Sequence, residues 1–218
     1  MSNRRSFLTQ LSAVAATSMA IDADELKAAT RSGTGEWDTS WLQRLAAAEY
    51  RVVFNASEIN DGAVMDYAAA FLDGFHEAHG TTDANTRPVI VFRRLGTTMA
   101  FNDVVWDRYA LAEDEKLNDP MTHAAARRNI FWKAKPGAVP AVAATTLEAL
   151  TTRGLISLVC NVATNNIGYG LAQKRHLDVE TVRSDLRANL IPRAILVPSG
   201  IYALIRAQNA GCAYMPGT

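Results

Sequence analysis

Leu155-Ile156-Ser157-Leu158-Val159-Cys160 is a short, almost continuously apolar run, and a segment with helical character follows it from Asn161 to about Gln173. An apolar run of this length is typical of a strand that is covered on both faces, as in a parallel sheet. Similar runs occupy residues 51–56, 88–92, 194–197 and 212–215. Because helical segments separate these strands, the pattern predicts βαβ units and a parallel sheet with helices on both faces.

The expected helices follow from apolar periodicity and from capping signals. A lead-in helix is expected from Trp41 to Ala48, and a long amphipathic helix opens at Asp61-Gly62. Asp178 is expected to cap another helix. The remaining helices are expected at 101–110, 142–152, 161–173, 178–189 and 201–209. Residues 111–141 read as an irregular insertion, which in a compact domain is usually functional or ordered by a partner.

The composition excludes several functional classes. The chain has 218 residues, of which 49% are hydrophobic and 20% charged, as expected for a globular protein. Lys and Arg number 22, as do Asp and Glu, so the formal net charge is zero. A nucleic-acid binder would carry a basic surface, so no nucleic-acid partner is expected. No apolar stretch is long enough to span a bilayer, so we expect no membrane insertion of the mature chain.

The N-terminus predicts export. Arg4-Arg5 is followed by Phe7-Leu8 and a weakly apolar run from Leu11 to Ile21, the pattern of a twin-arginine signal, with a cut after Ala20. The alternative is a frayed basic helix. We therefore expect a twin-arginine signal peptide at 1–20, a linker with the lead-in helix at 21–50 and a single domain at 51–218, delivered to the periplasm.

The candidate chemistry lies at the carboxyl ends of the strands, where open parallel sheets bind ligands. Cys160 ends its strand and precedes a helix, whose positive N-terminal end favours a thiolate. The alternative is that Cys160 is a packed core residue, since free cysteine is commonly buried. Arg93-Arg94 could hold an anion at the next strand end, or could serve as surface ion-pair partners. Ser199, in Pro198-Ser199-Gly200, follows a further strand.

The other candidates are weaker. Cys212 is expected to pack in the last strand, and a disulfide between the two cysteines would need their Cα atoms within about 7 Å. His76 and His79 share a helix face without a third ligand, so a solvated helix end is favoured over a metal site. Gly168-Tyr169-Gly170 lies inside a helical segment and is therefore no dinucleotide-binding motif. No cofactor is expected.

Two segments resemble the DsrE/DsrF-like sulfur-relay family. Residues 154–161, Gly-Leu-Ile-Ser-Leu-Val-Cys-Asn, are similar to that family's cysteine strand. In the tail, Val197-Pro-Ser-Gly200, Gln208 and Gly211-x-x-Tyr214 fall in the family's order. The likeness covers roughly Arg51 to Tyr214; it is strong over 150–215 and loose before residue 150.

The resemblance implies a three-layer α/β/α sandwich with a five-stranded parallel sheet, in a small homo-oligomer. It also implies that Cys160 carries sulfane sulfur as a persulfide and exchanges it with a donor or acceptor protein. Asn161, Ser199 and Arg93 are then the expected neighbours of the sulfur. The rival hypothesis is a non-catalytic binding or assembly protein of the same fold, with Cys160 merely packed.

Overall fold

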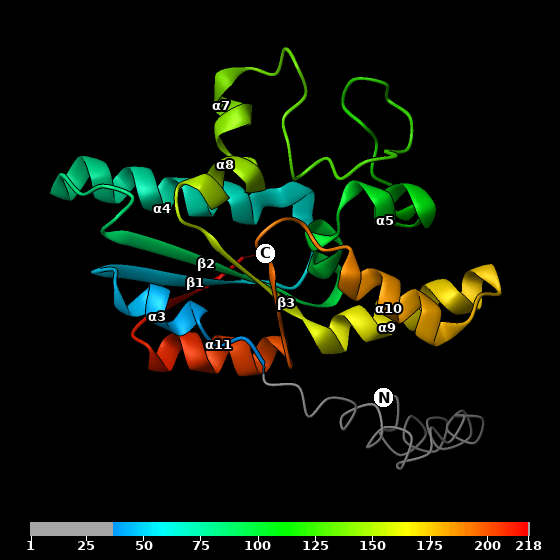
Figure 1. Ribbon diagram of the computed structural model, residues 1–218. Coiled ribbons are helices and arrows are strands. Elements are labelled where there is room, and N and C mark those ends of the chain that lie inside the picture. The colour runs from blue at the N-terminus through cyan, green and yellow to red at the C-terminus, as the bar shows by residue number, and fades with distance from the viewer. Residues whose placement is uncertain (1–36, 218) are drawn as a thin grey trace, which may run out of the picture. The chain divides into compact units, whose positions relative to one another are not determined.

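A computed structural model of the chain describes residues 37–217, and its strands form one sheet (Figure 1). The strand order is β4-β3-β2-β1-β5, and every neighbouring pair is parallel. The strands are β1 (Tyr50–Ala56), β2 (Thr86–Phe92), β3 (Ile156–Cys160), β4 (Ile195–Val197) and β5 (Ala213–Pro216). The predicted α/β fold with a five-stranded parallel sheet is confirmed. The predicted signal peptide and residues 21–36 of the expected linker lie outside the described residues.

One face of the sheet carries the larger hydrophobic cluster. The helix α4 (Ala63–His79) packs here through Val64, Ala68 and Leu72, against Phe54 and Ile90 of the sheet. The helices α8 (Leu147–Thr152), α9 (Asn161–Arg175) and α10 (Val179–Ala188) contribute to the same cluster. The connections from β1 to β4 all step in one direction across the sheet, so right-handed crossovers bring their helices to one side.

The opposite face is covered by α3 (Trp41–Ala46) and α11 (Gly200–Asn209). Val53, Val91 and Leu158 of the sheet pack there with Leu204 and Trp41. The chain passes from β4 through α11 to β5 at the far edge, which reverses the direction of travel, so a right-handed crossover places α11 on the second face. The three-layer arrangement is therefore confirmed.

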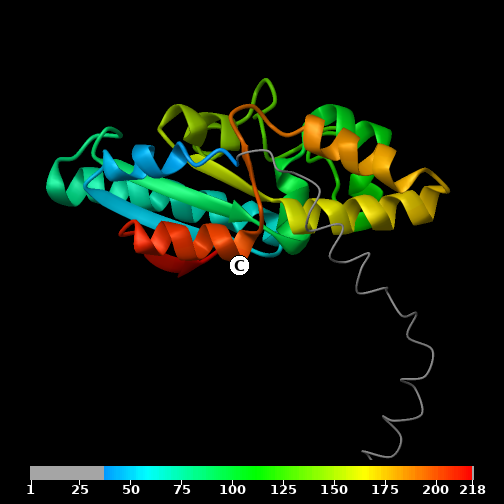
Figure 2. The same cartoon turned by 60° about the horizontal axis from the view of Figure 1, so that its bottom comes forward.

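The helices α9 and α10 run side by side past the carboxyl ends of the strands (Figures 1 and 2). Arg187 of α10 joins them, since its Nη2 donates to Asn165 Oδ1 at 2.5 Å and its Nε donates to Asn161 Oδ1 at 3.2 Å. Asp178 caps α10 as predicted, because its carboxylate accepts from the N–H of Thr181. This pair of helices extends one side of the sheet's carboxyl edge.

Several element boundaries differ from the sequence predictions. The single helix expected over 142–152 is wrong: the chain forms α7 (Pro140–Ala144) and α8, and the Thr146 side chain caps α8 by accepting from Ala149 N–H. The helix expected over 101–110 is shortened to α5 (Asp103–Arg108), because the Asn102 side chain caps it. Two helical turns were not predicted, η2 (Asn60–Gly62) and η3 (Arg94–Ala100). The last strand begins one residue after Cys212.

The insertion expected at 111–141 begins with α6 (Leu111–Glu115) and is irregular from Lys116 to Val139. Asn129 anchors it although only 1% of that residue is exposed. Its Nδ2 donates to the carbonyls of Met99 and Phe101 at 2.8 and 2.7 Å, and its Oδ1 accepts from the N–H groups of Phe131 and Trp132. All the hydrogen-bonding capacity of the buried amide is therefore used to hold the insertion against η3 and α5.

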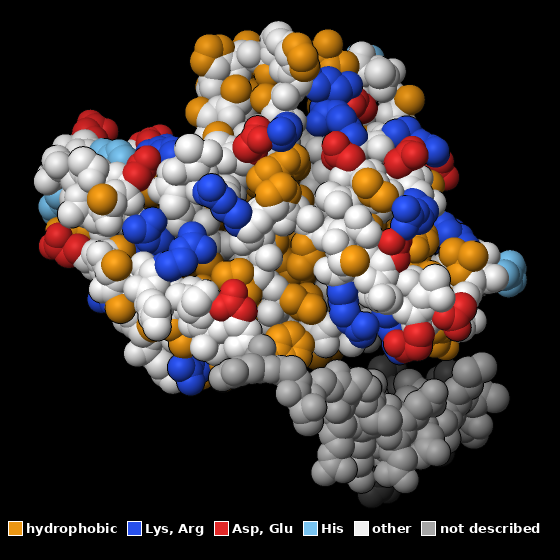
Figure 3. Space-filling view, viewed as in Figure 1, with side chains coloured by type: hydrophobic (Ala, Val, Ile, Leu, Met, Phe, Trp, Pro, Cys, Tyr) orange, Lys and Arg blue, Asp and Glu red, His pale blue; other side chains and the backbone are white. Residues whose placement is uncertain are grey.

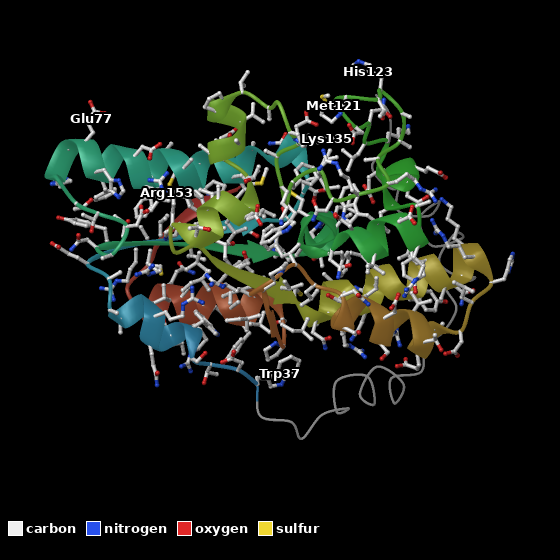
Figure 4. All side chains as sticks on the ribbon, turned by 45° about the horizontal axis from the view of Figure 1, so that its top comes forward. Trp37, Glu77, Met121, His123, Lys135 and Arg153 are labelled. Atoms are coloured by element: carbon white, nitrogen blue, oxygen red, sulfur yellow. The ribbon has the colours of Figure 1, made fainter. Side chains whose placement is uncertain are left out.

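A buried carboxylate makes a second anchor. Asp119 accepts from Lys135 Nζ at 2.6 Å, from Met121 N–H at 2.9 Å and from Arg128 Nε at 3.3 Å. Burial alone would raise the pKa of this carboxyl, but the Lys135 and Met121 hydrogen bonds and the Arg128 charge outweigh it and lower the pKa to about 2. In Figure 4 Met121, His123 and Lys135 lie together, far from Glu77 on α4.

None of the helices within residues 37–217 combines the length and the apolar character that a membrane span needs.

Candidate functional site

Polar side chains from neighbouring strands meet at the carboxyl edge of the sheet. Val91 of β2 pairs with Leu158 of β3, and both side chains belong to the cluster under α11. Arg93 and Cys160 lie two residues further along these strands, so the pleat directs them to the same face. Asn55 pairs with Val91, which places it on that face as well. These three side chains from neighbouring strand ends therefore lie at one edge and on one face of the sheet.

Cys160 is the last residue of β3 and the N-cap of α9. Its Sγ accepts a hydrogen bond from the N–H of Ala163 at 3.3 Å, and only 5% of the residue is exposed. Thr164 Oγ1 donates to the Cys160 carbonyl at 3.0 Å and fixes the start of the helix. The sulfur is thus held at the positive end of a 15-residue helix, as the sequence predicted.

Arg93 is oriented by a chain of hydrogen bonds that crosses the sheet edge. Its Nε donates to Asn55 Oδ1 at 2.7 Å, and Asn55 Nδ2 donates to the hydroxyl of Tyr214 at 3.1 Å. The two terminal nitrogens of the guanidinium make no hydrogen bond, and the group makes no ion pair, with any of residues 37–217. By contrast, Arg94 pairs with Glu58 at 3.3 Å on the surface. Arg93 is therefore positioned, and its charge has no ion-pair partner in the part of the chain that the structure describes.

Ser199 and Gly200 form the next strand end. Ser199 caps α11, since its Oγ accepts from Tyr202 N–H at 3.1 Å. A Cβ atom on Gly200 would lie 3.0 Å from Cβ and 3.1 Å from Cδ of Arg93, so the absence of a side chain lets the arginine stem lie against the helix. The start of α11 and the Arg93 side chain are thereby packed together.

A pocket of about 610 Å³ opens at this edge and is lined by Cys160, Arg93 and Ser199. This volume is within the range of small-molecule sites, about 300–1,000 Å³. Most of its remaining lining is apolar, including Leu95, Leu111, Val162, Ile167, Leu171 and Ile201. Three of these are large hydrophobic residues that are about half exposed: Leu95, Val162 and Ile201 at 44%, 46% and 53%. Figure 3 shows hydrophobic side chains gathered in the middle of the face where α9 and α11 begin in Figure 1.

The wall formed by α6 is acidic. Asp114 pairs with Lys174 and with Arg175, so its charge is compensated. Glu115 has no such partner among the described residues; burial raises its pKa, and the nearby charges of Asp114 and Glu58 raise it further. Within the described residues, the pocket therefore has a cation without an ion-pair partner at the sheet edge and acidic groups on α6.

The structure brings three of the four predicted site residues into one pocket. Asn161 is the exception, because its side-chain oxygen accepts from Arg187 of α10 and does not line the cavity. Sequence reasoning missed Asn55 and Tyr214 as partners of Arg93, and also the apolar walls from η3, α6 and α9. Asn55 is the last residue but one of β1, so its position near a strand terminus was the available signal.

Cys212 lies in a different environment. It precedes β5, 7% of it is exposed, and it packs in the cluster under α11. Burial raises the pKa of its thiol to about 11, although the Arg51 charge acts in the opposite direction. Because β2 and β1 separate β3 from β5, the two cysteines are about 14 Å apart across the sheet alone. Both thiols are free, and this separation excludes a disulfide between them within one chain.

The histidines of α4 lie at its C-terminal end. His76 Nε2 is 3.3 Å from the Asp83 carboxylate, and His79 stacks on Phe75 with ring centroids 5.5 Å apart. Within residues 37–217, no group of three or more His, Cys, Asp or Glu side chains is arranged to hold a metal ion.

Comparisons with known proteins leave the function open. No protein-family model matches the chain, and no curated protein matches it. A solved structure of a protein of unknown function, MTH1491 from Methanobacterium thermoautotrophicum, is similar at 16% identity and a TM-score of 0.39. The match covers 77% of this chain and 98% of that chain. A likeness at this level carries no information about function.

Proposed function

We propose that this protein is a sulfur carrier in which Cys160 accepts a sulfane sulfur atom as a persulfide and passes it to an acceptor thiol. The observation that carries the proposal is the position of the Cys160 sulfur: it lies at the N-terminus of α9, in a pocket that is also lined by Arg93, which is positioned by Asn55 and has no ion-pair partner among the described residues. The resemblance of residues 154–161 and of the tail to the DsrE/DsrF-like sulfur-relay family supports the same chemistry.

The transfer is balanced without an oxidant or a reductant. The Cys160 thiolate attacks the terminal sulfur of a persulfide donor R–S–SH, and a new Sγ–S bond forms as the donor's S–S bond breaks. The donor leaves as R–S⁻, and the transferred sulfur keeps its hydrogen. The second half-reaction is the same step in reverse, with an acceptor thiolate attacking the outer sulfur.

Each neighbouring group has a role in this step. The N–H of Ala163 donates to the Cys160 sulfur, and the helix behind it favours the anion. The Arg93 guanidinium attracts the second anion, on the donor or on the outer sulfur, which would otherwise repel the thiolate. Ser199 holds the N-terminus of α11, and with it the packing of Gly200 on Arg93.

The test is mass spectrometry of the protein purified from its own host under non-reducing conditions. We expect an added mass of about 32 Da, one sulfur atom, on the peptide that contains Cys160 and not on the peptide that contains Cys212. Cys160→Ser should keep the fold and lose the added mass. An unmodified Cys160 that iodoacetamide labels only after unfolding would favour a non-catalytic binding or assembly protein.

The Arg4-Arg5 sequence supports a further proposal, that the chain is exported to the periplasm by the twin-arginine route, which carries folded proteins. Assembly into a small homo-oligomer is a third, because β5 is an exposed edge strand with Tyr214 and Met215 at 45% and 47% exposure. Sedimentation of the purified protein measures the oligomer directly.

A further inference from the structure

The pocket beside Cys160 has features that a site for inorganic sulfur alone would not need. Apart from Cys160, Arg93 and Ser199, most of the surface near the sulfur is apolar, and Leu95, Val162 and Ile201 remain about half exposed there. Exposed apolar side chains that converge on one cavity mark a ligand or an interface. The volume of about 610 Å³ suits a small organic molecule, while a protein partner would need a broad surface.

The charges of the pocket fix how such a molecule would lie. The two terminal nitrogens of Arg93 have no partner among the described residues, and Arg93 lines the same pocket as Cys160 from the neighbouring strand end. Glu115 lines the α6 wall without an ion-pair partner among the described residues, and it offers an anion no attraction there. An anionic head is therefore favoured at Arg93, in the pocket that also holds the reacting sulfur, with an apolar body against Val162 and Ile201.

We infer that the sulfur donor of this protein is a small organic sulfane-sulfur anion with an apolar body, of the type R–SO₂–S⁻ or R–S–S⁻. The inference rests on the proposed sulfur-carrier function and adds the class of donor to it. For a thiosulfonate, the Cys160 thiolate attacks the outer sulfur, the new S–S bond forms as the sulfur–sulfur bond of the donor breaks, and R–SO₂⁻ leaves. Cys160–S⁻ plus R–SO₂–S⁻ gives Cys160–S–S⁻ plus R–SO₂⁻, so atoms and charge balance.

Binding is tested first, without chemistry, by calorimetric titration of the full protein with benzenesulfinate, the unreactive product of benzenethiosulfonate. Methanesulfinate carries the same head with almost no body, and we expect it to bind at least about tenfold more weakly. Arg93→Gln should weaken benzenesulfinate binding at least about tenfold, the usual effect of losing a hydrogen-bonded charge. The control is Arg206, an exposed residue of α11 that does not line the pocket. Arg206→Gln removes the same charge and should leave benzenesulfinate binding unchanged.

The apolar body is tested with a matched pair of variants on α11. Ile201 and Ile205 are 53% and 52% exposed, but only Ile201 lines the pocket. Ile201→Ser should narrow the preference for benzenesulfinate over methanesulfinate, and Ile205→Ser should leave it intact. Since both side chains are exposed, neither variant is expected to unfold the protein, and circular dichroism verifies this for Arg93→Gln as well.

Transfer is tested next, by mass spectrometry of Cys160 after exposure to benzenethiosulfonate or to thiosulfate, which has no apolar body. Faster loading from benzenethiosulfonate, lost in Arg93→Gln, supports the inference. If benzenesulfinate binds in a way that depends on Arg93 but no donor transfers sulfur to Cys160, the carrier function is overturned and the assigned class of ligand still stands. If Cys160 is loaded with sulfur equally by both donors and benzenesulfinate does not bind, the proposed donor class is overturned and the carrier function still stands. The exposed apolar residues would then serve a macromolecular partner.

Discussion

Replacing Asp119 by Asn should remove the charge that ties together the irregular insertion between α6 and α7. Its pKa falls from 3.8 to about 2 in the folded protein, which at about 1.36 kcal/mol per unit corresponds to about 2.4 kcal/mol. Arg128 and Lys135, the two cations that hold it, have side chains 25% and 26% exposed, so solvent screens part of this. We therefore expect Asp119→Asn to lower the free energy of unfolding by about 1–2 kcal/mol at pH 7.

The pH dependence gives the decisive measurement. Because the folded pKa of Asp119 is lower than the unfolded one, its stabilisation is present above about pH 4 and is lost as the pH falls toward 2. The Tm of the wild type should be about 2–8 °C higher than that of the variant at pH 7, and most of this difference in Tm should disappear by about pH 2.5. The exposed Glu77→Gln change on α4 is the control and should alter stability by less than about 0.5 kcal/mol. If the difference in Tm between the wild type and Asp119→Asn is the same at both pH values, the Asp119 charge is not what stabilises the insertion.

Three further predictions concern other parts of the chain. Cys212, whose pKa burial raises to about 11, should resist iodoacetamide at pH 8 in the folded protein, and rapid labelling there would contradict its buried position. Asn129→Ala should cost about 3–4 kcal/mol in urea unfolding, because it orphans two carbonyls and two N–H groups; a loss below about 1 kcal/mol would show that water replaces the amide. Changing both Arg4 and Arg5 to Lys should leave an uncut protein in the cytoplasm, and fractionation that finds it in the periplasm would exclude twin-arginine export.

The parallel sheet could be predicted from the sequence because its evidence is local. The apolar run that ends at Cys160 is followed at once by a helix, so the strand, the helix and the position of the sulfur between them all follow from about 20 residues. Arg93 and Ser199 follow the neighbouring strands β2 and β4, so the register of the parallel strands brings them to the same edge of the sheet as Cys160.

The walls of the pocket could not be predicted because they depend on contacts between distant segments. A Cβ on Gly96 would lie 2.3 Å from the carbonyl oxygen of Ala56, so η3 exists through its close packing on the end of β1. The break between α7 and α8 had a local signal that was overlooked: Thr146 precedes Leu147-Glu148-Ala149, and its hydroxyl accepts from Ala149 N–H. Tertiary packing therefore determines where η3 forms, whereas helix capping determines the break between α7 and α8.

The two cysteines show how the fold places one residue type in two different environments. Both are buried, at 5% and 7% exposure, so burial alone does not distinguish them. Cys160 is the last residue of β3, where its sulfur meets a helix N-terminus and an open pocket. Cys212 stands before the amino end of β5, where its N–H donates to the Ala207 carbonyl and its sulfur packs under α11. In a parallel sheet helices begin after the carboxyl ends of strands, so a cysteine gains dipole stabilisation and ligand access together at that edge and neither at the other.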